Sequence, residues 1–413
     1  MATVTGSAYG NVVLTAQQNG DLLQASGWGN VLNGNGLNVT INAGQGQATV
    51  NLGGGTSLVT AGGWNDIITG GDGTVTGPMG NSTVHFGNGN DFVSLTGWNN
   101  VVTMGGGTDT VYAGNGNLTV VGGNGTDLVA LGGFNNVAQL GDGNDTVTGP
   151  MGNSTVKLGN GNDYVSLTGY NNVVTMGGGA DTVYAGNGNI TVTGGNGNDL
   201  VSLGGWNNVV QLGDGANTIN GTQGSTTIFA GTGNNSVRLQ GWNNAVRLGS
   251  GDNTVVAGDG NASVSLGGGH NSLSLAGWNN IVSINGGTDT VFAAAGSDTV
   301  SINGTNLSVV GGAHATVMAE GAGADTVTDA SQALTIRIDG GSPNTTLVNL
   351  ASDPNWSIDL ANGVGGFNYS VANVIANLSS SGGNAVLNIG GGATVTFVGL
   401  PTAAITPDHI KFW

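Results

Sequence analysis

Apolar and polar residues alternate in short segments of about four residues, and a Gly-rich segment follows each of them. Residues 92–95 (Phe-Val-Ser-Leu) and 101–104 (Val-Val-Thr-Met) are two successive examples, nine residues apart. Because side chains alternate across a strand, Val93 and Leu95 point to one side of it. The pattern predicts short strands with one buried face, separated by tight turns. The expected interior residues of four consecutive strands are Val93 with Leu95, Val102 with Met104, Val111 with Ala113, and Val129 with Leu131.

The Gly-rich turns repeat every eighteen residues, which is two nine-residue units. One turn in each period ends in an Asp, and this series is Asp91, Asp109, Asp127, Asp145, Asp163, Asp181 and Asp199. A fixed period of this kind predicts a solenoid, in which equivalent residues of successive turns lie above one another. Two strands per turn then form two parallel sheets, back to back. The predicted fold is therefore all-β, a parallel β-roll (β-solenoid) of about 18 residues per turn.

Stacking brings the Asp carboxylates close together, because adjacent strands lie only about 4.8 Å apart. Like charges at that spacing repel one another unless a cation lies between them. Calcium is the natural candidate, since it takes about six to eight oxygen ligands, including carboxylates and backbone carbonyls. The alternative is a row of hydrogen-bonded Asx-turns without any ion.

The opposite edge of the predicted roll carries a second series, in which every other turn has an aromatic residue. The series is Trp28, Trp64, Trp98, Phe134, Tyr170, Trp206, Trp242 and Trp278. Its spacing is 36 residues except for 34 between Trp64 and Trp98, which indicates a local two-residue deletion. Three roles are open for these rings: covering and rigidifying one edge, self-association, or stacking on the sugars of a cell-surface polysaccharide.

The regular frame runs from about residue 26 to about residue 329. We expect residues 1–25 to form an N-terminal cap, because an open solenoid end exposes its core and its sheet edges. Residues 330–413 lose the nonapeptide pattern and are predicted to form a C-terminal β cap, with a hairpin over residues 384–398.

Composition narrows the class of protein. The chain has 413 residues, 83 of them Gly, no Cys, 7% charged residues and a formal net charge of −18. Five Lys and Arg residues cannot neutralise nucleic-acid phosphates, so a nucleic-acid partner is excluded. No segment is apolar over the length that a membrane span needs, and the N-terminus does not read as a Sec signal.

The nine-residue unit resembles the RTX, or hemolysin-type, calcium-binding nonapeptide family, whose pattern is Gly-Gly-x-Gly-x-Asp-x-apolar-x. In residues 86–94 an inward Phe86 replaces the first Gly of that pattern. The resemblance covers nearly three-quarters of the chain. It implies Ca2+ bound between consecutive turns, with these metal ligands: Asp91, Asp109, Asp127, Asp145, Asp163, Asp181 and Asp199.

The chain departs from the family pattern at both edges. The opposite edge has Asn100, Leu118, Asn136 and Ser154 where a second Asp row would stand. The Asp row itself changes to Asn217, Asn235, Asn253 and Asn271 before Asp289 and Asp325 resume it. An amide offers no charged ligand, but it can hydrogen-bond from turn to turn without an ion.

The resemblance also implies a bacterial protein that leaves the cell by type I secretion, and residues 405–413 are similar to the C-terminal signals of that route. We expect a structural protein of the cell surface that self-assembles into an S-layer, a filament or a biofilm matrix, since its outward strand positions are almost uncharged. The alternatives are a calcium-dependent adhesin, a polysaccharide-binding β-roll and an ice-binding β-roll.

We do not expect an enzyme. The chain contains no His-Glu-x-x-His or Gly-x-Ser-x-Gly motif. Its four His residues are scattered without a partner at metal-ligand spacing; they are His85, His270, His314 and His409. No catalytic residue is predicted.

Overall fold

A computed structural model describes residues 2–293, 296–311, 314–330, 333–339, 344–368 and 370–413. The chain divides into two compact units, Met1–Gly205 (unit 1) and Trp206–Trp413 (unit 2), and each is described by itself. Both units are built almost entirely of β-strands. Within the described residues the one α-helix is α1 (Val371–Ala376).

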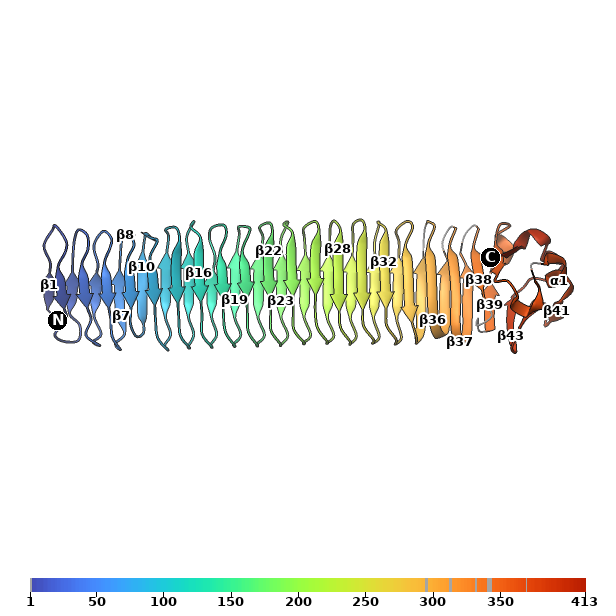
Figure 1. Cartoon of the computed structure of the whole chain (residues 1–413), viewed down its shortest axis with the longest axis horizontal. Coiled ribbons are helices and arrows are strands. Elements are labelled where there is room, and N and C mark those ends of the chain that lie inside the picture. Colours follow the sequence, from blue (N-terminus) through green and yellow to red (C-terminus); the bar gives the residue numbers. More distant parts are fainter. Residues whose placement is uncertain (1, 294–295, 312–313, 331–332, 340–343, 369) are drawn as a thin grey trace. The chain divides into compact units, whose positions relative to one another are not determined.

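Unit 1 is a parallel β-solenoid, in which successive strands along the chain alternate between two sheets. Figure 1 shows them as evenly spaced arrows joined by turns along two opposite edges. The first sheet contains β1 (Thr3–Thr5), β3 (Leu22–Gln24), β5 (Thr40–Asn42), β7 (Ser57–Thr60), β10 (Gly73–Gly77), β13 (Phe92–Leu95), β15 (Thr110–Ala113), β17 (Leu128–Ala130), β19 (Thr146–Gly149), β21 (Tyr164–Leu167), β23 (Thr182–Ala185) and β25 (Leu200–Leu203). The second sheet contains β2 (Val13–Thr15), β4 (Val31–Asn33), β6 (Thr49–Asn51), β9 (Ile67–Thr69), β12 (Thr83–His85), β14 (Asn100–Thr103), β16 (Leu118–Val121), β18 (Val137–Gln139), β20 (Thr155–Lys157), β22 (Asn172–Thr175) and β24 (Ile190–Thr193).

Neighbouring strands of each sheet pair in parallel, with a register of eighteen residues at most pairs, as in Val93 opposite Val111 and Val102 opposite Val120. The register is nineteen between β1 and β3, where Thr3 lies opposite Leu22. The register falls to sixteen at one place, where Ser57 pairs with Gly73 and Ile67 pairs with Thr83. The predicted β-roll and its two-residue deletion are therefore both confirmed. Two further short strands, β8 (Gly63–Trp64) and β11 (Met79–Gly80), pair beside the deletion.

The core of unit 1 lies between the two sheets and consists of the inward residues that the alternation predicts. Val93, Val102 and Val111 are fully buried, and Phe86, which replaces a Gly of the family pattern, is buried as well. Ala113 is half-buried. Each turn of chain contributes only a few apolar side chains, so the core is narrow and its packing depends on the stacking of turns.

Unit 2 begins with the same architecture. One of its sheets contains β26 (Asn208–Gln211), β28 (Thr226–Ala230), β30 (Asn244–Leu248), β32 (Ala262–Leu266) and β34 (Ile281–Asn285). The other contains β27 (Thr218–Gly221), β29 (Ser236–Leu239), β31 (Thr254–Ala257), β33 (Ser272–Leu275) and β35 (Thr288–Ala293). Two longer strands follow, β36 (Thr299–Gly311) and β37 (Thr316–Asp329), and each continues through a position where earlier repeats have a turn.

The C-terminal part of unit 2 keeps some parallel pairing. Its strands are β38 (Thr335–Ile338), β39 (Asn344–Val348), β40 (Ser357–Leu360), β41 (Leu378–Ser381), β42 (Asn384–Gly390), β43 (Ala393–Phe397) and β44 (Ile410–Phe412). The predicted hairpin is confirmed, because β42 and β43 pair in antiparallel fashion. The last strand, β44, pairs with β40, and the ring of His409 stacks on Trp356 with centroids 4.1 Å apart.

The expected caps share strand pairing with the frame between them. Strands β1 and β2 pair in parallel with β3 and β4, in the same way as the strands that follow. At the other end, β38 and β39 pair in parallel with β37. The boundaries at residues 25 and 330 thus mark a change in sequence pattern within continuous strand pairing.

Candidate metal centre

The seven Asp residues of the predicted calcium row come together in one column along an edge of unit 1. Each directly precedes a strand of the first sheet, so the eighteen-residue register that pairs β13 with β15 also places Asp91 beside Asp109. All seven side chains are buried inside their turns: Asp91, Asp109, Asp127, Asp145, Asp163, Asp181 and Asp199. We call this column the Asp row.

One oxygen of each carboxylate in the Asp row is held by the backbone of the preceding turn. The N–H of Asp91 donates to Oδ1 of Asp109 at 2.8 Å, and the N–H of Asp109 donates to Oδ1 of Asp127 at 3.1 Å. The same bond recurs at 2.8 to 3.1 Å in each step up to Asp199. The row is therefore a continuous chain of hydrogen bonds that fixes every carboxylate in one orientation.

The second oxygen has no such partner in the six Asp residues from Asp91 to Asp181. Oδ2 is buried without a hydrogen bond in Asp91, Asp109, Asp127, Asp145, Asp163 and Asp181. A buried carboxylate oxygen that is neither hydrogen-bonded nor paired with a cation is costly in the charged form. These atoms mark the places where the fold lacks positive charge.

The pKa values of the row reflect this arrangement. Burial raises the pKa of Asp91 to about 6 and that of Asp109 to about 7, opposed by the backbone N–H bond to each and reinforced by the negative charge of neighbouring Asp residues. Asp163 resembles Asp109, with a pKa raised to about 7. Asp21 shows the opposite case: it accepts N–H groups from Gln17, Gln18 and Ala2 on both oxygens, and these bonds lower its pKa.

The Asn-bearing turns of unit 2 show which atoms surround the position that Oδ2 occupies in the Asp row. In Asn253, Oδ1 accepts the N–H of Asn235, as in the Asp row, and Nδ2 takes the place of Oδ2. This amide nitrogen donates toward the carbonyl oxygens of Gly249 and Gly251 at 3.2 and 3.0 Å, and toward Oδ1 of Asn271 at 3.0 Å. Asn235 and Asn217 make the same three contacts. The second side-chain atom thus sits among three oxygens.

An Asp in the same turn places an oxygen where Asn places an NH2 group. For Asp91 the repeat makes Gly87 and Gly89 the equivalents of the two glycines, and Asp109 the equivalent of the next side chain. Carboxylate and carbonyl oxygens without a donor among them form a set that Ca2+ prefers. The residues of the Asp row therefore fit calcium, which would supply the positive charge that the amide supplies in the Asn turns.

Two Asp residues outside the predicted row share these features. Asp66, on the opposite edge of unit 1, accepts the N–H of Ala48 at 2.8 Å, has a buried Oδ2 without a partner, and has a pKa raised by burial to about 6. Asp298 of unit 2 is held in the same way by Asn280. Sequence reasoning missed both, although each stands in the eighteen-residue frame of the opposite edge, where its neighbours are Asn, Ser or apolar residues.

Elsewhere on the opposite edge, neutral side chains accept the backbone N–H groups that carboxylates accept in the Asp row. The amide of Asn100 accepts the N–H of Ser82 at 3.1 Å and donates to the carbonyl oxygens of Met79 and Gly97. Asn136 likewise donates to Gly133. A full second row of calcium sites is therefore not supported by these side chains, in agreement with the departure from the family pattern.

The described part of the chain holds no cluster of three or more His, Asp or Glu side chains that could by themselves hold a metal ion. A site in the Asp row differs from such a cluster, because it would combine the carboxylates of two successive turns with backbone carbonyl oxygens of the Gly-rich turns. None of the helices in the described residues is long and apolar enough to cross a membrane.

Comparison with known families gives the same class of repeat. Eight segments match the family described as "RTX calcium-binding nonapeptide repeat (4 copies)": residues 103–138, 121–156, 140–174, 157–189, 177–210, 207–237, 243–275 and 283–301. These segments are RTX-type calcium-binding nonapeptide repeats, and Ca2+ is the cofactor of such repeats. No curated protein and no solved structure showed significant similarity to the chain.

Proposed function

We propose that this protein is a secreted, calcium-stabilised structural repeat protein that self-assembles into an extracellular layer, filament or matrix at the bacterial surface. RTX repeats are typical of secreted proteins, which supports the location. Calcium binds between successive turns of the Asp row, from Asp91 to Asp199. The Asn turns from Asn217 to Asn271 need no ion, because their amides already donate to the surrounding oxygens.

The observation that carries self-assembly is the outer face of the two sheets in unit 1. Its outward positions bear apolar or aromatic side chains that are about two-fifths exposed: Tyr112, Val137, Tyr164, Val173 and Tyr184. Two ring pairs lie across neighbouring strands, Phe92 with Tyr112 at 5.7 Å and Tyr164 with Tyr184 at 5.8 Å. Flat, uncharged and repeated patches of this kind favour contacts between copies, and repetition makes weak contacts add.

Calcium would promote assembly in two ways. It would order the Asp-bearing turns, so that the outer faces become flat and periodic. It would also reduce the self-repulsion of a chain with a net charge of −18, which opposes close packing of copies.

Sedimentation of the purified protein in millimolar calcium and in chelator tests this function. We expect large assemblies in calcium only, and weaker lateral association in the variant Tyr112→Lys, Tyr164→Lys, Tyr184→Lys, whose buried Val and Leu residues are unchanged. A protein that stays monomeric in calcium at high concentration would refute the proposed assembly.

A further inference from the structure

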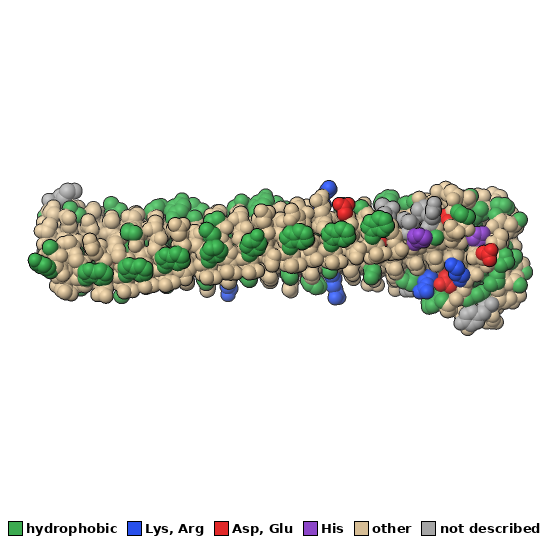
Figure 2. Space-filling model, turned by 90° about the horizontal axis from the view of Figure 1, so that it is seen from above, with side chains coloured by type: hydrophobic (Ala, Val, Ile, Leu, Met, Phe, Trp, Pro, Cys, Tyr) green, Lys and Arg blue, Asp and Glu red, His purple; other side chains and the backbone are tan. Residues whose placement is uncertain are grey.

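The aromatic residues of unit 1 form a row along the edge opposite the Asp row. We call this row the aromatic edge; it consists of Trp28, Trp64, Trp98, Phe134 and Tyr170. The rings are about half exposed, with Trp98 at 55% and Tyr170 at 64%. Figure 2 shows separate hydrophobic side chains in a row on a face that is otherwise mostly uncharged. One ring every two turns gives a step of roughly 9.5 Å, twice the strand spacing.

The first two rings of the edge, Trp28 and Trp64, each have a glycine beneath them in the next turn. A methyl group placed on Gly46 would lie 3.1 Å from Cζ3 of Trp28, and one placed on Gly80 would lie 2.8 Å from Cε3 and Cζ3 of Trp64. The sequence supplies a Gly one turn after every ring of the edge, at Gly46, Gly80, Gly116, Gly152 and Gly188. At Trp28 and Trp64 the absence of a side chain on the glycine lets the ring lie close to the backbone of the next turn, while about half of the ring stays exposed.

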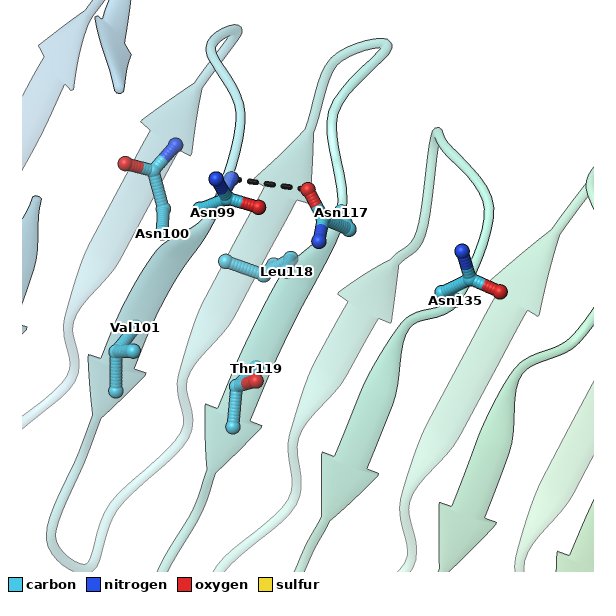
Figure 3. A pocket seen from close by; sticks show the side chains of 7 residues that line it. All are labelled: Asn99, Asn100, Val101, Asn117, Leu118, Thr119 and Asn135. Atoms are coloured by element: carbon cyan, nitrogen blue, oxygen red, sulfur yellow. Dashed lines mark hydrogen bonds between the residues drawn. The ribbon is translucent and has the colours of Figure 1, made fainter. Parts of the chain in front are cut away.

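A row of amides runs beside the rings. Asn99 and Asn135, each directly after a ring, adopt a left-handed backbone with φ of 57° and 59°. The N–H of Asn99 donates to Oδ1 of Asn117 in the intervening turn at 3.0 Å. Figure 3 shows that Asn99, Asn117 and Asn135 line a recess together with Val101 and Thr119. The surface therefore combines flat apolar rings with planar groups that both donate and accept hydrogen bonds.

Charge distinguishes the part of this edge around Trp98, Phe134 and Tyr170 from the rest of an acidic chain. The turns around the last three rings, residues 96–100, 114–118, 132–136, 150–154 and 168–172, contain no charged residue. A net charge of −18 would repel a polyanion, and the edge offers no cation to attract one. A neutral ligand rich in hydroxyl groups matches the edge, because its polar rim meets amides and its flat apolar faces meet rings.

We propose that the aromatic edge of unit 1 binds an extended, uncharged β-1,4-linked polysaccharide lying along the row. In such a chain, sugars two apart present the same face, and this two-sugar repeat is close in length to the two-turn step of the rings. Successive rings would stack on every second sugar of the polysaccharide, one ring to one sugar. The neighbouring Asn amides would hydrogen-bond to the hydroxyl groups of the sugars. The proposal does not depend on self-assembly, which involves the outer sheet faces.

Retention of the calcium-loaded protein on insoluble polysaccharides tests this proposal. Crystalline cellulose and chitin represent the two common neutral β-1,4-linked chains, and an alginate gel is the anionic control. We expect retention on cellulose or chitin and none on alginate. The variant Trp98→Ala, Phe134→Ala, Tyr170→Ala should reduce affinity at least tenfold, since contacts along one chain add. Phe134→Trp should retain or strengthen binding, because a larger ring stacks better.

The matched control is Phe229→Ala, Phe292→Ala in unit 2, which removes exposed rings outside both the aromatic edge and the sheet faces assigned to self-assembly and should leave retention unchanged. Circular dichroism of every variant verifies the fold. No retention on cellulose or chitin, equal retention on alginate, or full retention of the triple variant would overturn the proposal. The proposal would also be overturned if the triple variant kept its retention on polysaccharide and lost only the ability to form sedimenting assemblies. That result would mean that the rings contact another copy of this chain.

Discussion

The backbone N–H of Asp91 donates to Oδ1 of Asp109 at 2.8 Å, while Oδ2 of Asp109 is buried without a hydrogen bond. The equivalent pair in unit 2, Asn235 and Asn253, has the same first bond and an amide nitrogen in place of that oxygen. The two kinds of turn therefore differ in one side-chain atom, which is Oδ2 in Asp and Nδ2 in Asn. The surrounding oxygens are satisfied by the NH2 group in the Asn turns and need a cation in the Asp turns.

Replacing Asp145 by Asn should raise the melting temperature in chelator and lower it in calcium. In chelator the new amide donates to the surrounding oxygens and removes a buried charge, so the melting temperature should rise, by an amount that corresponds to about 1–3 kcal/mol. In calcium the variant should bind at least one calcium ion fewer than the wild type, and its melting temperature should be lower than that of the wild type. Thermal unfolding in both buffers measures this. A variant that is destabilised in both would contradict the role of Oδ2.

The converse change, Asn253→Asp, should create a need for calcium in unit 2. The new oxygen would face the carbonyl groups of Gly249 and Gly251 without a donor. We expect a loss of about 1–3 kcal/mol in chelator, which millimolar calcium should restore. Asn253→Gln is the control, since it changes the side chain without adding a charge and should not respond to calcium.

Calorimetric titration should count the ions. The seven Asp residues from Asp91 to Asp199 define six gaps between successive turns. We expect about six bound calcium ions per chain from this row, because each gap is bordered by two carboxylates. Asp66 and Asp298 would account for an excess, and their Asn variants would remove it. Fewer than two ions per chain would rule out the row as a calcium site.

Stability in chelator should fall as pH rises. The folded pKa values of Asp91, Asp109 and Asp163 are raised from 3.8 to about 6 or 7. The folded state therefore holds more protons than the unfolded state between pH 4 and pH 7, and stability declines across that window. Calcium should remove the decline, since it replaces the protons. Melting curves at several pH values test this, and a calcium-free protein that gains stability from pH 5 to pH 7 would contradict it.

Much of this structure could be predicted from the sequence because the period is regular. The eighteen-residue spacing was enough to stack Asp91 on Asp109 and to place Phe86 inside the core. The two-residue deletion near Trp64 followed from one irregular interval. These features depend only on which residues repeat, and a solenoid converts sequence spacing directly into neighbours.

The atomic roles within each turn could not be predicted in that way. Which carboxylate oxygen accepts the backbone N–H, and which remains without a partner, depends on the path of the turn. The role of Asn253 as a donor to Gly249 and Gly251 depends on the same path. Asp66 was missed because a single Asp among neutral residues has no repeat to reveal it. The continuation of β36 and β37 through turn positions also has no signal in the nonapeptide pattern.

The most direct test is hydrogen exchange of the backbone amides, measured by mass spectrometry in calcium and in chelator. The account predicts that removing calcium strongly accelerates exchange in residues 87–199, where Asp side chains line the turns. Residues 213–271, where Asn side chains replace them, should keep most of their protection. Equal loss of protection in both segments, or no loss in residues 87–199, would contradict the account.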